Sequence, residues 1–507
     1  MKKLSVYIIL ITFIAKLFGL GRDLALSYVY GASNISDAYL VSITVPTVIF
    51  SLISISLAAT FIPMFENIQN KKGREASNRF VNIVLINLLF VSTIIIILIY
   101  FFSETLVYIF ASGFEGNTLI IATDLLKINV FILYFSVIST IFGSLLQIRG
   151  SFLIPAFITV PFNILIVFSI IASGIFGYPL LSIGLVFASI VQVLILVPFV
   201  VKQGFDFYWI FDFKNSDFRK MIKMSAPVLI GSSVTQVNII IDRTLASRIT
   251  SGGISALNYG DRLTGFAVGL FVISVINLIY PKLCKYSADL NLNGFKDLIN
   301  KAIFGISLFI IPMTVGFSIF TKEIIELLFF RGEFNETSIM LTSGALAFYS
   351  LGMMGFSMRE LLSRIFFSLS DTKTPVINAS LGIFINIVLN IILSRYFGIG
   401  GLALATSIAA TVTTLLLLIS LRKKIGPFGM KQISISFLKI LFASLVMGGL
   451  AKLSFNYLTS SLSQSLSLLL AIGVAVISYF MIIYFMKIED VDIFVGAIKK
   501  KIGRGTV

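Results

Sequence analysis

The 507-residue sequence contains no histidine, one cysteine and one tryptophan. Without histidine, Ser-His-Asp catalysis, Cys-His catalysis and His-ligated metal sites are excluded. The lone Cys284 cannot form an internal disulfide, and we expect it to be an inert small side chain. With Trp209 as the only tryptophan, any aromatic belt must consist of Tyr and Phe. A GxxxxGK[ST] motif is also missing, so this chain alone cannot form a nucleotide-driven pump.

Charged residues are scarce as well. They make up 12% of the chain, whereas hydrophobic residues make up 57%. A soluble domain has about a quarter charged residues. The mean hydropathy of the whole chain is +1.02, so the apolar excess extends along its full length. This excludes a soluble enzyme with a single membrane anchor. The composition predicts an all-α polytopic membrane protein.

Apolar stretches long enough to cross a bilayer predict about fourteen transmembrane helices. The first follows Lys2 and Lys3 as a signal peptide would, but no small-residue cleavage site comes after it, so we interpret it as a membrane helix. The expected spans are 4–21, 36–63, 80–102, 123–147, 153–173, 180–201, 222–247, 256–281, 298–320, 340–363, 375–395, 399–421, 434–456 and 464–486.

Basic residues are unequally divided between the two sides of this predicted topology. With a cytoplasmic N-terminus, the inside segments hold 27 of the 39 Lys and Arg residues, and the outside loops hold four. Because Lys and Arg concentrate in cytoplasmic loops, we expect both termini in the cytoplasm of a multi-pass protein. The net charge of +16 then reflects topology and attraction to anionic lipid head groups, and predicts no nucleic-acid partner.

Two segments of the first half recur in outline in the second half. Residues 142–166 correspond to 361–389, and residues 180–197 correspond to 397–417. An offset of about 220 residues, with six helices per half, predicts a parallel repeat of two six-helix lobes around a central cavity. The expected domains are an N-terminal lobe, a cytoplasmic linker, a C-terminal lobe, a cytoplasmic loop, two extra helices and a basic cytoplasmic tail, at 1–201, 202–221, 222–421, 422–433, 434–488 and 489–507.

Charged residues inside predicted spans are costly and are therefore candidates for function. Lys16 lies deep in the first span, where it either lines the cavity or extends along the helix to the interface. Arg22 and Asp23 follow, and Asp37 opens the second span. The two acids either support a cavity or lie in plain interfacial positions.

The second half carries the pairs Asp242-Arg243 and Asp261-Arg262. By analogy with the first half, Arg262 would face Lys16 and Arg22 across the cavity. Several cations with few compensating anions suit a polyanionic head group such as a diphosphate. Asp261 either supports this cavity or neutralises its neighbouring arginine.

A second polar set consists of neutral residues and one acid. Asn386 and Asn390 are four residues apart and share a helix face, and Thr406 lies on the next helix. Together with Asp242 they offer oxygen ligands for a small hard cation such as sodium. Spacing alone favours interhelical hydrogen bonds over an ion site.

These residues resemble the MurJ (MviN) family of lipid II flippases, in the multidrug/oligosaccharidyl-lipid/polysaccharide exporter superfamily. The matching segments are FGLGRDLALSYVYGASNISDAYLVSITVP (18–46), ALNYGDRLTGFAVGLFVISVINLIYPKL (256–283), SDTKTPV (370–376) and GLALATS (401–407). The resemblance implies a fourteen-helix, non-enzymatic transporter of the bacterial cytoplasmic membrane. It would carry undecaprenyl-diphosphate-linked muropeptide, lipid II, from the inner to the outer leaflet by alternating access.

The resemblance also implies roles for individual residues. It assigns the diphosphate to Lys16, Arg22 and Arg262, with Asp23 and Asp37 as supporting acids. It places the lipid tail in a groove of the last two helices. The family's sodium site maps onto four residues, with Asn390 where the family has an acid: Asp242, Asn386, Asn390 and Thr406. A family arginine and glutamate of the second helix are replaced by Phe50 and Ile55.

Several alternatives stay open from the sequence. A polysaccharide or O-antigen flippase of the same superfamily is favoured by the missing second-helix arginine. A drug/cation antiporter predicts an acid-rich cavity, and an integral glycosyltransferase needs paired acids on sizeable outside loops, whereas the largest, 102–122 and 321–338, are expected to be solvated. A scaffold in a complex of cell-wall synthesis proteins would have a degenerate cavity. Sodium, protons and membrane potential all remain open as energy sources.

Overall fold

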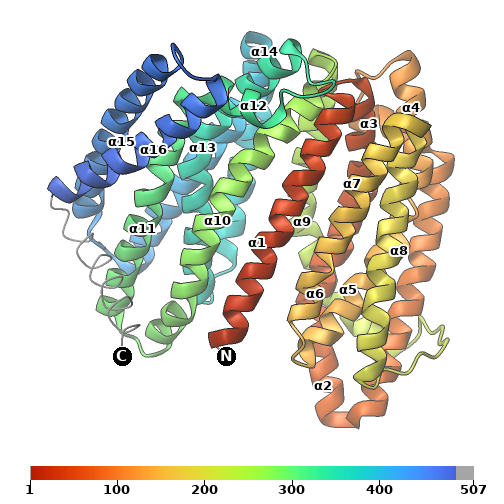
Figure 1. The fold of residues 1–507 in the computed structure, drawn as a ribbon. Helices are drawn as coiled ribbons and strands as arrows, with labels where there is room; N and C mark the ends of the chain where they lie inside the picture. The colour runs from red at the N-terminus through yellow and green to blue at the C-terminus, as the bar shows by residue number, and fades with distance from the viewer. Residues whose placement is uncertain (1, 487–507) are drawn as a thin grey trace, which may run out of the picture. The chain divides into compact units, whose positions relative to one another are not determined.

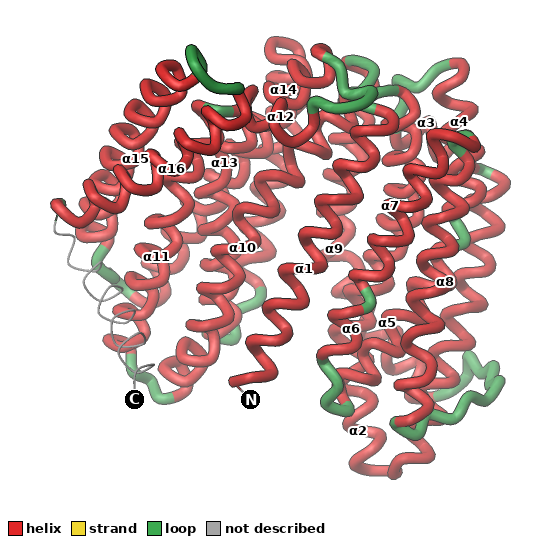
Figure 2. Tube along the Cα trace, in the orientation of Figure 1, coloured by secondary structure: helices red, strands yellow, loops and turns green. Residues whose placement is uncertain are grey.

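The computed structural model describes residues 2–486, and this part of the chain contains helices and loops without any strand (Figure 2). The predicted all-α class is therefore confirmed. The expected basic tail, 489–507, lies outside the described residues. The helices are α1 (Lys2–Tyr30), α2 (Asn34–Phe101), α3 (Ser103–Phe110), α4 (Gly116–Asn129), α5 (Ile132–Ile148), α6 (Leu153–Phe157), α7 (Thr159–Phe176), α8 (Pro179–Lys202), α9 (Ser216–Ile249), α10 (Gly253–Ala288), α11 (Leu292–Ile319), α12 (Thr321–Phe329), α13 (Glu336–Ser368), α14 (Lys373–Ile425), α15 (Met430–Leu458) and α16 (Gln464–Phe485).

Two helices are too long to be single membrane spans. Helix α2 has 68 residues and α14 has 53. At 1.5 Å per residue, α2 would reach roughly 100 Å, about three times the hydrocarbon thickness of a bilayer. Each is interrupted by a glycine with positive φ, Gly73 (φ 83°) in α2 and Gly398 (φ 55°) in α14. Glycine adopts this conformation without a Cβ penalty, so each long helix comprises two spans joined at a kink.

The described helices account for every predicted span. By length and composition, nine helices in residues 2–486 can cross a membrane, or eleven if each of two bent pairs counts as one span. One bent pair, α4 and α5, meets at 41° within the predicted span 123–147. The kinks divide α2 and α14 into two spans each, which adds two to the eleven. Helix α1 contains the first predicted span and is the fourteenth. The chain thus has the fourteen-helix membrane fold.

The chain divides into two compact units, which are described separately. The first comprises Met1–Ala256 and Arg331–Ser338. Its core lies between both arms of α2, α5, α8 and the start of α9, with Phe61 stacked on Phe80 at 6.0 Å between ring centroids. Helices α7 and α8 lie side by side in this unit (Figure 1).

The second unit comprises Leu257–Phe330 and Ile339–Val507. Its main core joins α10, α11, α13 and α14, and α15 and α16 pack as a pair against α11. Membrane helices approach closely where side chains are small. On α13, a Cβ at Gly352 would lie 2.4 Å from Ser407 Oγ of α14, so only glycine permits this contact.

The two segments predicted to be the largest outside loops differ from the solvated loops expected from sequence. Segment 102–122 contains α3 and the start of α4, and segment 321–338 contains α12. Residues four apart form one buried face of α12, namely Thr321, Ile325 and Phe329. The loop expectation is wrong there because this amphipathic face packs into the unit.

Candidate functional site

The charged residues of α1 form a local pair on a loosely packed helix. Arg22 Nη2 lies 3.2 Å from Asp23 Oδ1, and the Arg22 side chain is 25% exposed while that of Asp23 is 4% exposed. Lys16, less than two turns earlier, is also partly exposed. Asp23 therefore orients the Arg22 guanidinium, which keeps exposed N–H groups that suit an oxyanion.

Asp37 has a setting different from the cavity position expected from sequence. Its side chain is 1% exposed, and Oδ2 accepts a hydrogen bond from the Gly252 backbone N–H at 2.8 Å. Its Oδ1 accepts from both the backbone N–H and the hydroxyl of Ser255, each at 2.7 Å. A carboxylate in this position satisfies the unpaired N–H groups at the start of α10. Asp37 is thus a helix cap, and its carboxylate is not presented to a ligand.

Asp242 lies near the end of α9 beside a residue that the sequence interpretation missed. Asn238 Nδ2 donates to Asp242 Oδ2 at 3.1 Å, while the buried Asn238 Oδ1 has no hydrogen-bond partner. The neighbouring Arg243 donates to the Ile254 carbonyl at 3.2 Å. Asn238 stands four residues before Asp242, a helical spacing that was available as a signal.

Asn386, Asn390 and Thr406 meet across the Gly398 kink of α14. Asn390 Nδ2 donates to Asn386 Oδ1 at 3.0 Å, and Asn386 Nδ2 donates to Thr406 Oγ1 at 3.2 Å. Both asparagines are buried. Three of the four predicted sodium ligands therefore lie together, joined by hydrogen bonds, while Asp242 belongs to the first unit. Within residues 2–486, no three His, Cys, Asp or Glu side chains gather as around a metal ion.

Asp261 and Arg262 lie in the second unit, on the α10 segment. Both side chains are exposed, whereas the flanking Tyr259 and Leu263 are buried. The predicted diphosphate residues are thus divided between the units, with Lys16 and Arg22 in the first. The Arg262 side chain is exposed and carries the planar N–H groups that recognise phosphate and carboxylate oxygens.

An apolar groove of about 430 Å³ lies in the second unit among α10, α11, α12, α15 and α16. Its lining is almost entirely hydrocarbon and aromatic, which suits an apolar ligand. Residues from each helix contribute to it, including Phe271, Phe309, Phe317, Phe320, Met447 and Phe480.

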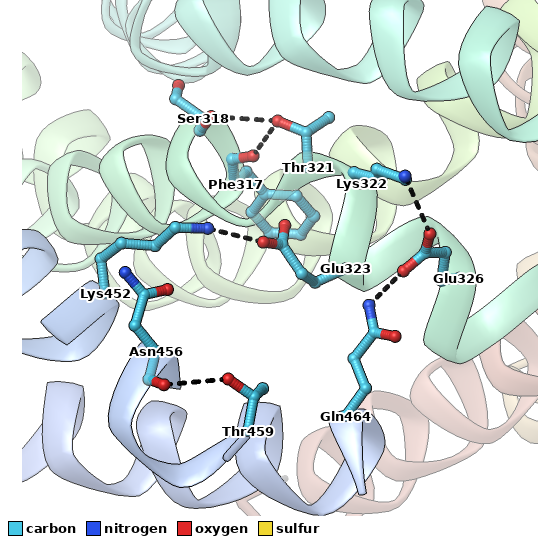
Figure 3. A network of polar contacts seen from close by, with 10 residues as sticks. All are labelled: Phe317, Ser318, Thr321, Lys322, Glu323, Glu326, Lys452, Asn456, Thr459 and Gln464. Atoms are coloured by element: carbon cyan, nitrogen blue, oxygen red, sulfur yellow. Dashed lines mark hydrogen bonds and ion pairs between the residues drawn. The ribbon is translucent and has the colours of Figure 1, made fainter. Parts of the chain in front are cut away.

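A polar network borders this groove (Figure 3). Lys452 Nζ of α15 lies 2.6 Å from Glu323 Oε1 of α12, and it stands 5.2 Å from the ring centroids of both Phe320 and Phe455. The same α12 carries Glu326, which contacts Lys322 and Gln464. Lys452 falls within the predicted span 434–456, and its partner depends on tertiary packing.

Comparison with known proteins gives a consistent family match. A family model described as the lipid II flippase MurJ matches residues 26–482. A Buchnera aphidicola subsp. Baizongia pistaciae protein, described as a probable lipid II flippase MurJ, is 27% identical over 417 residues. That alignment covers 80% of this chain and 81% of the relative.

Solved structures extend the match to the fold. The structure of a lipid II flippase MurJ in an inward closed conformation has a TM-score of 0.83 and 28% identity, covering 95% of this chain and 98% of that chain. The structure of an inward-facing multidrug resistance MATE family transporter of the MOP superfamily has a TM-score of 0.69 at 14% identity. That match covers 81% of this chain and 94% of that chain. The second likeness concerns the fold alone.

Proposed function

We propose, since the chain belongs to the MurJ family of lipid II flippases, that it moves lipid II from the inner to the outer leaflet of the bacterial cytoplasmic membrane. The family match over residues 26–482 carries this proposal. The likeness to the inward closed MurJ structure along 95% of the chain supports it. The protein acts as a transporter and performs no chemistry on its cargo.

The cargo's diphosphate is held by Lys16, Arg22 and Arg262. The exposed part of Arg22 supports this role, because a planar guanidinium binds phosphate oxygens through paired N–H groups. Asp23 fixes the guanidinium, and Asp261 balances Arg262. Alternating access then moves the head group between leaflets without carrying its charge through hydrocarbon.

The polyprenyl tail occupies the apolar groove beside α15 and α16. Tail and head group therefore bind separate surfaces, one apolar and one cationic. The groove's lining of aromatic and aliphatic side chains supports this division.

The driving force is the membrane potential or a sodium gradient. For sodium, the ligands are Asp242, Asn386, Asn390 and Thr406. Asn386 is bonded to both Asn390 and Thr406, so an ion that used the Asn386 oxygen must displace a hydrogen bond. Both termini lie in the cytoplasm, as the basic loops indicate, where proteins of cell-wall synthesis deliver the cargo.

Complementation tests the function. In a strain depleted of its lipid II flippase, we expect the wild-type chain to restore growth and Arg22→Ala and Arg262→Ala to fail at equal membrane abundance. Arg395→Ala is the matched control, since Arg395 is an exposed arginine that no proposed site uses. Failure of an inserted wild type would refute lipid II transport, and full rescue by both alanine variants would refute the cationic site.

A second candidate is a flippase for another undecaprenyl-diphosphate-linked glycan. It is favoured by Phe50, which stands where the family has an arginine and packs against the first unit's core. Transport assays on the reconstituted protein, with lipid II and with an O-antigen-type lipid, distinguish the two candidate functions. Faster transport of the O-antigen-type lipid would identify that lipid as the cargo and would leave the proposed mechanism unchanged.

A further inference from the structure

The segment between α8 and α9, residues 203–215, is bound to α2 by three buried asparagines. Asn82 pairs with it through both amide atoms, donating to the Asp206 carbonyl and accepting from the Tyr208 N–H, each at 2.9 Å. Asn87 pairs with Asp212 in the same two-way manner, at 2.9 and 3.3 Å. Asn78 donates to the Gly204 carbonyl at 2.9 Å.

Two arginines complete the attachment at the beginning of this linker. Arg74 donates to the Gln203 carbonyl at 2.6 Å, and Arg149 donates to the same carbonyl. Arg149 also donates to Asn78 Oδ1 at 2.9 Å. A linker in water needs no such partners, because water satisfies its backbone. Irregular backbone near lipid is tolerated only where protein groups satisfy it.

The opposite side of the linker is a row of exposed aromatic side chains. Trp209 is 77% exposed, and Phe207, Tyr208 and Phe211 are each more than half exposed. Phe211 also lies edge-on to Phe90 of α2, at 5.0 Å between centroids. The linker backbone is thus hydrogen-bonded to α2, while the aromatic rings of residues 207–211 remain exposed.

This aromatic row continues the lipid-facing surface of α2. Beyond the asparagines, α2 exposes Phe90, Ile94, Ile97 and Phe101. At the Gly73 turn it carries Arg74, and an exposed Arg79 follows between Asn78 and Asn82. The row therefore lies between a charged end and an apolar surface, the position at which Trp and Tyr concentrate in membrane proteins.

We propose that residues 205–213 are an interfacial anchor, which seats the first unit in the lipid leaflet on the side of the basic loops. That leaflet is the cytoplasmic one in the proposed orientation. The occupant is the region of phospholipid head groups and upper acyl chains. Flanking cations favour anionic lipids, namely Lys202, Lys214, Arg219, Lys220 and Lys223. The anchor is independent of which lipid-linked glycan is transported.

The single tryptophan makes the anchor directly measurable. The full chain is reconstituted in nanodiscs whose phospholipids carry bromine near the head group or at the acyl-chain end. We expect Trp209 emission to be blue-shifted, weakly quenched by acrylamide, and lost most strongly with bromine near the head group. Anionic lipid should deepen that loss relative to neutral lipid.

Two relocated tryptophans provide the controls in a Trp209→Phe background. Gln69→Trp, on the exposed turn of α2, reports the response of a residue in water. Phe176→Trp, at the end of α7, reports the quenching of an equally exposed side chain, 77% exposed, outside the linker. If Trp209 behaves like the Gln69 position, quenched by acrylamide and indifferent to brominated lipid, the anchor is refuted. Protection from acrylamide only after a cytosolic protein is added would assign the row to that protein instead, and would also refute it.

Asn82→Leu tests the attachment. It removes the partners of Asp206 and Tyr208, so Trp209 should lose lipid quenching and gain acrylamide quenching. Asn163→Leu is the matched control, because the buried Asn163 amide bonds only within its own helix, to the Thr159 carbonyl. Equal emission changes in both variants would show a general loosening rather than a released anchor.

Discussion

The charged pair on α1 and the amide cluster on α14 place polar groups inside helices in opposite ways. Arg22 is charged and partly exposed, and only one side of it is bound, by Asp23. Asn386 and Asn390 are neutral and buried, and their amides join each other and Thr406. The Arg22 side chain is 25% exposed and can meet a ligand, whereas the Asn386 amide has both its oxygen and its nitrogen bonded within the cluster.

This difference assigns the two clusters different tasks. A cation with accessible N–H groups binds an anionic head group without first breaking a contact. A chain of amide hydrogen bonds between the two arms of α14 stabilises their approach, as polar side chains do between membrane helices. An ion that used the Asn386 oxygen would have to replace its hydrogen bond from Asn390.

Removing the Arg22 charge should give the largest effect. Arg22→Ala removes a charge-assisted contact worth about 1.5–3 kcal/mol, which corresponds to a roughly 10- to 100-fold loss of lipid II binding. Binding to purified protein and flipping in proteoliposomes measure it. Arg22→Lys should retain part of both activities. Asp23→Asn should cost less than Arg22→Ala; an equal loss would make the pair, rather than the arginine, the functional element.

Breaking the amide chain should affect stability more than transport. Asn386→Leu leaves Asn390 and Thr406 without their partner, and we expect a loss of about 1–2 kcal/mol. Thermal unfolding in detergent measures it, and transport per folded molecule should be unchanged where the membrane potential, and not sodium, drives it. A melting temperature that sodium raises in the wild type but not in Asn386→Leu would contradict this assignment and make the cluster an ion site.

The fold was largely predictable because a bilayer demands long apolar stretches, and each predicted span lies on one helix or on two consecutive helices. The kinks at Gly73 and Gly398 were not predicted, since a glycine between two spans is equally typical of a loop. The SDTKTPV segment was recognised by pattern alone. In the structure its Asp371 accepts from the Thr374 N–H and hydroxyl, which begins α14.

The polar partners were less predictable than the helices. A charge in a span, such as Arg22, signals its own importance through its cost. The contact between Lys452 and Glu323 depends on how α12 packs, and sequence marked α12 as loop. Likewise, hydropathy revealed neither the cap formed by Asp37 nor the backbone bonds of Asn82, because both partners lie more than 100 residues away.

Beside the groove, the Lys452–Glu323 pair should have an intermediate effect. Lys452→Met leaves Glu323, 13% exposed, without its cation. Because Lys452 itself is 39% exposed, solvent screening limits the expected destabilisation to about 1 kcal/mol. Unfolding of the purified protein measures it. The double variant Lys452→Met/Glu323→Gln should recover part of the loss, and no recovery would attribute the effect to lost packing on Phe320 and Phe455.

The smallest effect should come from the exposed end of α14. The hydrogen bond from Lys424 at 2.5 Å, with those from Thr374, lowers the pKa of Asp371 from 3.8 to about 2. A carboxyl group with a depressed folded-state pKa stabilises the protein above its unfolded pKa, so this contribution is complete at neutral pH. It is lost as pH falls from about 4 to about 2. The wild type should therefore melt above Asp371→Asn by a constant margin between pH 8 and 5, and below pH 4 it should lose this advantage. If the wild type still melts above Asp371→Asn at pH 2, the contacts with Thr374 and Lys424 stabilise this segment without the carboxylate charge, and the prediction is wrong.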